Sequence, residues 1–345
     1  MKIAQLLSAS TGGIGRHVGS IAARMRDRGH QLRIFCPELT ARSQRFADLG
    51  LQVLPLSSLD RAAGADVLHA HGFKAGAYAL PVAKIIGAPL VVTWHNAVLG
   101  SGGSAWTGRM LQRFVARGAD LTLGASSDLV SEALRLGARR ARLAAVAAPA
   151  LPVATVSRED ERARLGLSPD DLMVLTVGRL APQKNLGLLA DVTAAVRDRP
   201  DLQFVVVGEG PERAALERRI TADGSRIRLL GHRDDVPSLL HAADLALLTS
   251  TWEARALVAQ EALLSGLPLI STRVGGIEEL VGGAAVLVEP GDAIDMASRL
   301  IALADDPGER RRLAAASLRQ AAGWPDEDDV VEDLLASYAA VQVRR

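Results

Sequence analysis

The sequence has little cysteine, few aromatic residues and no long apolar run. Its single cysteine, Cys36, excludes an intramolecular disulfide and is typical of a reducing compartment. Aromatic residues make up 3% of the chain and hydrophobic residues 48%, so the cores must consist of Ala, Val, Leu and Ile. No run reaches the roughly 20 apolar residues that span a bilayer, and residues 1–9 are too short for a signal peptide. We therefore expect a cytoplasmic protein.

The net charge of +1 conceals two halves of opposite sign. Residues 1–150 contain 18 Lys and Arg against 8 Asp and Glu, a net charge of +10, and the remainder of the chain carries −9. The basic half indicates an anionic substrate or surface. Its basic residues are not interleaved with aromatic ones, so we expect no nucleic-acid partner.

Two series of short apolar segments, each alternating with helical segments, predict an α/β protein with two Rossmann-like, doubly wound parallel-sheet domains. The expected strands of the first domain are 2–7, 31–36, 66–71 and 90–94. Those of the second domain are 172–177, 204–207, 227–230, 245–248, 269–271 and 286–288. The Ala- and Pro-rich stretch 147–154 is the predicted linker. We expect domains at 1–150 and 151–325, followed by a helix in 326–345 that crosses back to the first domain.

A glycine-rich turn at residues 8–15 leads from the first strand into a predicted helix at 16–28. Gly13 and Gly15 allow the backbone to approach a ligand closely at the helix start. The spacing from Gly13 to Gly19 is one residue longer than in a dinucleotide fingerprint, and the second strand ends in Cys36-Pro37 rather than in an acidic residue. Both features disfavour a nicotinamide or flavin, and we expect no cofactor.

Three histidines stand at or next to the ends of expected strands: His69, His71 and His95. Because ligands of open parallel sheets bind beyond the carboxyl ends of the strands, we expect these side chains near one crevice. The spacing of His69 and His71 suits metal ligands, but no cysteine or carboxylate clusters with them. The sequence therefore predicts no metal site.

The segment from Trp106 to Arg117 has helical periodicity. Apolar residues form one broad arc (Trp106, Met110, Leu111, Phe114, Val115), and three arginines form a row beside it (Arg109, Arg113, Arg117). Such a helix is suited to lie on an anionic membrane surface, which would make the protein peripheral at the inner face of the membrane. The alternative is an ordinary packed helix with a solvated arginine face, and the sequence leaves both open.

The stretch 249–276 carries two carboxylates eight positions apart, Glu253 and Glu261. On a continuous helical path they would lie about 12 Å apart along the axis, which is too far to share a proton or a metal ion. They could hold the two ends of an elongated ligand whose phosphates lie at the helix N-terminus. The alternative is that both are solvated helix residues.

Several motifs in register resemble retaining glycosyltransferases of family four, which have the GT-B fold. In the second half they are GRLAPQKN at 178–185, VVGEGPE at 206–212, LLGHRDDV at 229–236, AADLALLTS at 242–250 and RVGG at 273–276. In the first half they are TGGIGRHV at 11–18, RGH at 28–30, HAHG at 69–72 and TWHN at 93–96. The resemblance covers nearly the whole chain and implies two Rossmann-like domains facing a central cleft.

The resemblance also implies roles for individual residues. Arg179 and Lys184 would hold the donor diphosphate, Glu253 the donor sugar and Glu261 the ribose, and His95 would lie near the transferred sugar and the acceptor. The remaining implied donor-binding residues contact the donor largely through their main chain: Gly13, Gly15, Gly178, Gly208, His232, Arg233, Arg255, Ala256 and Leu257. One departure is Glu253-Ala254-Arg255-Ala256, where the family commonly has Glu-Gly-Phe-Gly, so the donor pocket is expected to be slightly reshaped.

The implied activity is transfer of a sugar, with retention, from a UDP- or GDP-linked donor to an acceptor that is anionic or lipid-linked. The leaving diphosphate can take the acceptor proton, so neither a carboxylate base nor a metal ion is required. The acidic run Asp326-Glu327-Asp328 opens the last helix, where negative charge favours the helix dipole, and we interpret it as structural. The alternatives are a nucleotide-sugar epimerase, which would convert its donor without an acceptor, and a non-catalytic nucleotide-sugar-binding protein.

Overall fold

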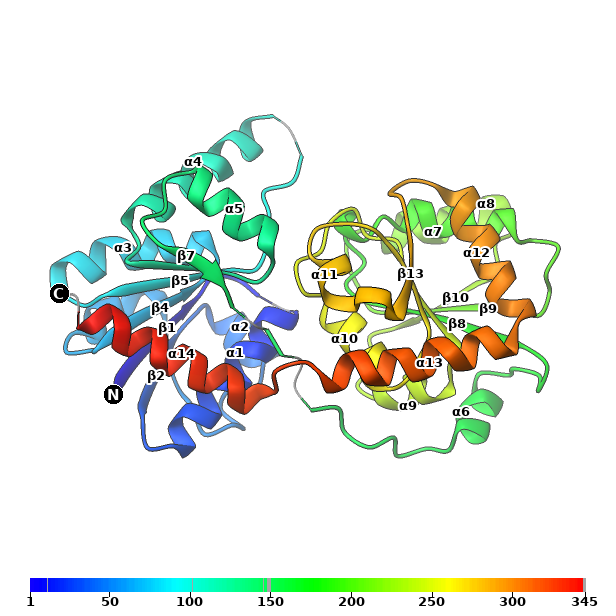
Figure 1. The fold of residues 1–345 in the computed structure, drawn as a ribbon, viewed down its shortest axis with the longest axis horizontal. Helices are drawn as coiled ribbons and strands as arrows, with labels where there is room; N and C mark the ends of the chain where they lie inside the picture. The colour runs from blue at the N-terminus through cyan, green and yellow to red at the C-terminus, as the bar shows by residue number, and fades with distance from the viewer. Residues whose placement is uncertain (11, 101, 145, 148–149, 344–345) are drawn as a thin grey trace. The chain divides into compact units, whose positions relative to one another are not determined.

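The computed structural model describes residues 1–345 except 11, 101, 145, 148–149 and 344–345. The chain divides into two compact units (Figure 1). Unit 1 consists of Met1–Pro149 together with Pro325–Arg345, and unit 2 is Ala150–Trp324. Each unit is built around its own parallel sheet.

The sheet of unit 1 has seven strands in the order β3-β2-β1-β4-β5-β6-β7, all paired in parallel. The strands are β1 (Lys2–Leu7), β2 (Gln31–Phe35), β3 (Gln52–Leu54), β4 (Val67–His71), β5 (Leu90–Trp94), β6 (Leu121–Gly124) and β7 (Ala141–Leu143). The chain thus winds outward from β1 in both directions. This order brings the carboxyl ends of β1, β4 and β5 side by side at the middle of one edge of the sheet.

Helices cover both faces of this sheet. They are α1 (Gly13–Asp27), α2 (Glu38–Ser43), the short 3₁₀ helix η1 (Leu56–Ala62), α3 (Phe73–Ile86), α4 (Gly103–Gly118), α5 (Ser127–Arg135) and α14 (Glu327–Gln342). The last of these, α14, packs against α1 (Figure 1). Apolar residues of α1 and α14 share one core with the sheet, including Val18, Ile21, Val67, Val91 and Val331.

Ion pairs fix α14 to unit 1. The carboxylate of Glu327 is buried and receives Arg24 at 3.0 Å, and Asp328 pairs with Arg24 and Arg28, each at 2.9 Å. Residues 325–345 bring six carboxylates and two arginines to a unit whose first 149 residues carry +10, so the net charge of unit 1 falls to +6. The acidic run at the start of α14 therefore balances α1 rather than binding a ligand.

Unit 2 has a six-stranded parallel sheet in the order β10-β9-β8-β11-β12-β13. The strands are β8 (Leu172–Val177), β9 (Leu202–Val207), β10 (Ile227–Gly231), β11 (Leu245–Leu248), β12 (Leu269–Thr272) and β13 (Ala285–Val288). The helices are α6 (Arg158–Arg164), η2 (Pro182–Lys184), α7 (Leu186–Ala195), α8 (Arg213–Asp223), α9 (Val236–Ala242), α10 (Leu257–Leu264), α11 (Ile277–Val281), η3 (Gly282–Ala284), α12 (Ala293–Asp305) and α13 (Pro307–Ala322). Separate apolar cores fill its two faces.

The predicted pair of doubly wound parallel sheets is confirmed. The sequence pattern missed β3, β6 and β7, which are only three or four residues long. β3 and β7 lie at the two edges of the sheet and are incompletely buried, so they lack the apolar run that identifies a central strand. Across the described part of the chain, no helix combines the length and apolarity needed to cross a bilayer.

Candidate active site

A partly buried ion pair lies at the carboxyl end of the unit 2 sheet. Lys184 Nζ lies 2.6 Å from Glu253 Oε1, with 23% of the lysine side chain and 9% of the glutamate side chain exposed. The same Glu253 oxygen accepts a hydrogen bond from Ser250 Oγ at 2.7 Å. Lys184 ends the 3₁₀ helix η2, which follows β8, and Glu253 lies in the loop that follows β11. A carboxylate and an ammonium group are thus fixed together where parallel sheets bind ligands.

Hydrogen bonds to main-chain carbonyls tie together three segments, residues 178–185, 249–256 and 273–276, which we call the three-loop cluster. Thr249 Oγ1 donates to the Lys184 carbonyl at 2.8 Å, and the Thr251 amide donates to the Gln183 carbonyl at 2.8 Å. The Gly276 amide donates to the Glu253 carbonyl at 2.8 Å. These bonds hold Lys184 and Glu253 on a rigid support, as a preorganised site requires.

Glu253 does not lie on a helix, contrary to the helical path that the sequence suggested. α10 begins at Leu257, and residues 249–256 form an irregular loop. Gly275 allows the loop to adopt this conformation. Its φ is +50°, and a Cβ at that position would clash with the Glu253 carbonyl oxygen at 2.0 Å. The estimate of about 12 Å along a helix axis therefore does not apply to Glu253 and Glu261.

The N-terminus of α10 follows directly after this loop. Ala256 is its N-cap residue, and no side chain in the described part of the chain caps it. The first amides of such a helix, beginning with Leu257, suit an anion. Glu261 lies one turn further along and is 3% exposed. Arg255 is largely buried, and burial lowers the pKa of its guanidinium, although the negative charge of Glu279 opposes this shift.

Gly178 and Gly208 lie where β8 and β9 end. Gly208 has a φ of +135°, and a Cβ there would lie 1.9 Å from the Gly178 carbonyl oxygen, so the two chain segments can approach only without a side chain. Arg179, which follows Gly178, is exposed. The close approach therefore fixes the backbone that carries Arg179 and leaves its side chain in solvent.

His232 and Arg233 follow β10 at the same edge of the sheet. The Arg233 side chain is engaged within unit 2: Nε lies 2.7 Å from Asp235 Oδ1, and Nη2 lies 3.3 Å from Glu161 Oε1. His232 Nε2 lies 3.3 Å from Asp234 Oδ1, and both side chains are exposed. Any ligand contact of Arg233 is thus left to its main chain, as the resemblance implies.

In unit 1, Gly13 is the first residue of α1, and Gly12 is the N-cap. Gly15 lies two residues further on and is buried, and a Cβ there would lie 2.4 Å from Gln44 Cδ. Gly15 therefore packs closely against the Gln44 side chain. Gly13 remains the glycine positioned to present an amide at the helix start.

Four histidines form a buried row in unit 1, and we call them the histidine row: His17, His69, His71 and His95. His71 Nδ1 lies 3.2 Å from His95 Nε2. The His69 and His71 rings are 4.1 Å apart between centroids, and those of His17 and His95 are 5.9 Å apart. The expectation that His69, His71 and His95 lie together is confirmed.

Burial keeps the histidine row neutral. It lowers the pKa of His17 to about 4 and that of His69 to about 3. The pKa values of His71 and His95 lie well below 6.5, first because of burial and second because a charge on one ring would repel a charge on its neighbours. Among the described residues, no group of three or more His, Cys, Asp and Glu side chains is arranged to hold a metal ion.

Two hydroxyl groups that the sequence did not single out hold His69. Its Nδ1 lies 2.6 Å from the Tyr338 hydroxyl of α14, and its Nε2 lies 2.7 Å from Thr93 Oγ1 of β5. Thr93 could have been found, because it stands two positions before His95 and therefore faces the same side of the strand. Tyr338 is 269 residues away from His69 and carried no local signal.

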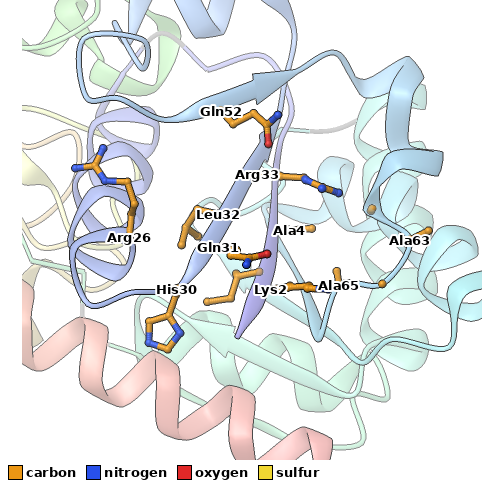
Figure 2. Close-up of a pocket in the computed structure, with 13 residues that line it drawn as sticks. Lys2, Ala4, Arg26, His30, Gln31, Leu32, Arg33, Gln52, Ala63 and Ala65 are labelled. Carbon is orange, nitrogen blue, oxygen red and sulfur yellow. The ribbon is translucent and has the colours of Figure 1, made fainter.

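A cavity of about 390 Å³ lies at the opposite end of the unit 1 strands (Figure 2). Lys2, Gln31 and Gln52, which begin three adjacent strands, line it with Arg26 and Arg33. Its arginines already have partners: Arg26 bonds Asp27 at 2.6 Å, and Arg33 bonds the Arg61 carbonyl. The cavity is thus remote from the carboxyl ends of β4 and β5, where His71 and His95 lie.

The exposed face of α4 is apolar and basic. Trp106 is 60% exposed, Met110 48% and Phe114 52%, and they follow one another at four-residue spacing. The sequence placed Val115 on the same arc, but Val115 is fully buried. In the part of the chain that the structure describes, Arg109, Arg113 and Arg117 form no ion pair, whereas Arg24, Arg28 and Arg142 pair with α14.

Comparison with known proteins supports the glycosyltransferase family that the sequence motifs resemble. Residues 171–306 match the family described as Glycosyl transferases group 1, and residues 12–149 match the Glycosyl transferase 4-like domain. The alpha-D-kanosaminyltransferase of Streptomyces kanamyceticus is 32% identical over 281 residues, covering 74% of this chain and 72% of that protein. The D-inositol 3-phosphate glycosyltransferase of Pseudarthrobacter chlorophenolicus is 31% identical over 285 residues, covering 75% of this chain and 67% of that protein.

Solved structures share the fold. Anabaena HepE in complex with UDP superimposes with a TM-score of 0.86 at 22% identity, covering 99% of this chain and all of that one. A sucrose-phosphate synthase from Thermosynechococcus elongatus gives a TM-score of 0.80 at 18% identity, covering all of both chains. The two Rossmann-like domains are therefore those of the GT-B fold, and the chain belongs to the group 1 glycosyltransferases, the family that its motifs resemble.

Proposed function

We propose that the protein transfers a sugar, with retention, from a nucleotide-diphosphate sugar to an acceptor. The observation that carries this proposal is the partly buried Lys184–Glu253 ion pair, 2.6 Å between Nζ and Oε1, on the three-loop cluster. When a glycosidic bond to a diphosphate breaks, negative charge grows on the leaving phosphate. A lysine placed there, together with Arg179 and the first amides of α10, stabilises that charge without a metal ion. Glu253 then holds the sugar.

UDP is the donor nucleotide that the comparisons favour. Structures of the Anabaena relative contain UDP and UDP-glucose. In this chain Glu261 is buried on α10 and is suited to the ribose hydroxyls, while the main chain of His232 and Arg233 is suited to the base. GDP remains the competing donor nucleotide. The part of the pocket that binds the sugar is the part that Ala254-Arg255-Ala256 would reshape.

The test is a thermal-shift panel with UDP, GDP, ADP and their common sugar conjugates, on wild type, on Lys184→Ala and on a matched control. Lys84→Ala is the control, because Lys84 is an exposed lysine of α3. Saturation at 100 times the dissociation constant should stabilise unit 2 by about 2.7 kcal/mol. We expect one nucleotide family to stabilise wild type and Lys84→Ala but not Lys184→Ala. Equal stabilisation of all three proteins would remove Lys184 from the donor site.

Measurements of turnover distinguish a transferase from an epimerase and from a non-catalytic binding protein. Loss of Lys184 or replacement of Glu253 by Gln should lower kcat about 10²–10³-fold, the usual effect of removing one charge-stabilising contact. The anomeric configuration of the product, read by NMR, tests retention. An epimerase would convert its donor with no acceptor present, and a binding protein would show stabilisation without turnover.

We further propose that the acceptor is anionic or lipid-linked and that α4 docks on an anionic membrane surface. Trp106, Met110 and Phe114 offer exposed apolar area, and three arginines beside them can each contribute about 1 kcal/mol near an anionic surface. Sedimentation with vesicles tests this. Phe114→Glu should abolish binding to vesicles rich in anionic lipid, whereas Ile294→Glu, at a 74%-exposed site on α12, should leave it unchanged. Equal binding to neutral and anionic vesicles would refute it.

A further inference from the structure

The histidine row offers an inference about the chemical form of His95 that rests on the proposed function. His69 and His71 alternate with Ala70 on β4, so both point to the face of the sheet that α1 and α14 cover. Thr93 is the register partner of His71 on β5, and His95 follows two positions later on the same side. The row therefore runs along this face toward the carboxyl end of the strands.

Two hydroxyl groups fix His69, the member of the histidine row farthest from the carboxyl end of the strands. Tyr338 and Thr93 bond both nitrogens of His69, at 2.6 Å and 2.7 Å, so this ring can neither flip nor tilt without losing a buried hydrogen bond. The His69 ring lies against the His71 ring at a centroid separation of 4.1 Å. His71 is consequently supported on one side by a ring that cannot move.

The contact between His71 and His95 admits two arrangements of hydrogen. Both rings are neutral, so each carries one N–H, and only one hydrogen can lie between His71 Nδ1 and His95 Nε2. If His71 donates, its Nε2 is a bare acceptor. If His95 donates, His71 must carry its own hydrogen on Nε2, where it becomes a buried donor.

The surroundings of His71 Nε2 decide between the two. This atom is buried, and it has no hydrogen-bond partner among the residues that the structure describes. Among backbone groups, buried donors without a partner are rarer than buried acceptors without one, and we extend this order to the imidazole nitrogens. The arrangement in which His71 donates from Nδ1 is therefore the favoured one.

We propose that His71 is a positioning residue that holds His95 as the neutral tautomer with its hydrogen on Nδ1. In this form His95 Nε2 is occupied by His71, and Nδ1–H is the group that can reach a ligand. His95 then donates a hydrogen bond to an oxygen of the acceptor and does not serve as a general base. The acceptor proton goes instead to the leaving diphosphate.

The tautomer can be measured without any knowledge of substrate. Two-bond ¹H–¹⁵N correlation spectra of protein labelled with ¹⁵N-histidine distinguish neutral Nδ1–H from neutral Nε2–H, and His95→Asn identifies the His95 signals by their loss. We expect His95 in wild type to carry its hydrogen on Nδ1 at pH 7. A wild-type spectrum with the hydrogen on Nε2 would overturn the proposal.

Two variants at position 71 separate positioning from packing. The amide of His71→Asn takes the place of Nδ1–H and can still donate, whereas His71→Leu is of similar size and cannot. We expect His71→Leu to shift His95 toward the Nε2–H tautomer and to lower kcat about tenfold with the donor KM little changed, and we expect His71→Asn to preserve both. The same tautomer and the same kcat in both variants would refute a positioning role.

The outcomes also separate this inference from the proposed function. If wild type turns over no nucleotide sugar, the proposed function fails, while the spectra still decide the tautomer. If His71→Leu does not fold, as judged by circular dichroism, the wild-type and His71→Asn spectra decide it, because loss of the Nδ1–H form in His71→Asn contradicts the proposal.

Discussion

Mild acid should destabilise unit 1, because its buried histidines bind protons only after unfolding. The native pKa is about 4 for His17 and about 3 for His69, against 6.5 in an unfolded chain. A lowered native pKa means that the stabilisation is fully present above pH 6.5 and is lost as the pH falls toward the native value. Each such histidine lowers the free energy of unfolding by ~1.4 kcal/mol per pH unit in this range.

The expected loss is large relative to the stability of a domain. From pH 6.5 to pH 5, His17 and His69 together should remove ~3 kcal/mol. His71 and His95 act in the same direction, because their pKa values are also lowered. Domains commonly have ~5–15 kcal/mol in total. Carboxylates with lowered pKa values, such as Asp328 and Asp235, lose their contribution only below about pH 4, outside this interval.

Urea unfolding between pH 5 and pH 7 tests this prediction. A variant that keeps the fully buried Trp94 as its sole tryptophan reports on unit 1 by fluorescence. Replacing His69 by Gln in that background should reduce the slope of free energy against pH by ~1.4 kcal/mol per pH unit, whatever its effect on stability at pH 7. A free energy of unfolding that stays level between pH 7 and pH 5 would refute the reasoning.

Two further predictions concern stability at neutral pH. Gly208→Ala should destabilise unit 2 by more than about 3 kcal/mol, because its Cβ would lie 1.9 Å from a carbonyl oxygen; Gly224→Ala, at a φ of +64° in open space, should cost only about 1 kcal/mol. Urea unfolding of the two variants checks this, and equal losses would show that the clash is relieved. Tyr338→Phe should cost about 1–3 kcal/mol because His69 Nδ1 loses its partner, whereas Phe at the exposed Tyr78 should change stability by less than about 0.5 kcal/mol. Similar melting temperatures for the two tyrosine variants would contradict that role of the hydroxyl.

The sequence predicted the elements whose signal is local. Buried parallel strands are continuous apolar runs, so β1, β5, β8 and β11 were placed with bounds that match the structure. The ends of β4 and β5 were placed well enough to bring His71 and His95 together. The edge strands β3 and β7 were missed, because they are held by neighbours in the sheet rather than by their own composition.

The site was less predictable where contacts between distant segments decide the conformation. Glu253 was expected on a helix because helical spacing is the only local signal around it, yet its loop is held by hydrogen bonds to Gln183, Lys184 and Gly276 from other parts of the chain. The engagement of Arg233 by Glu161, 72 positions away, is of the same kind. Such bonds depend on tertiary structure, and one sequence carries no trace of them.

The two units differ in how they treat charge, and this difference fits the proposed chemistry. Unit 2 fixes two full charges, Lys184 and Glu253, which under the proposed function would face the diphosphate as it gains negative charge. Unit 1 presents neutral imidazoles, whose burial keeps them from becoming cations. A sugar that loses a diphosphate develops positive charge on its ring, as in other glycosyl-transfer transition states. A cation beside the sugar would repel that charge, whereas a neutral imidazole would not. The low pKa of the histidine row is thus a consequence of burial that also suits the proposed chemistry.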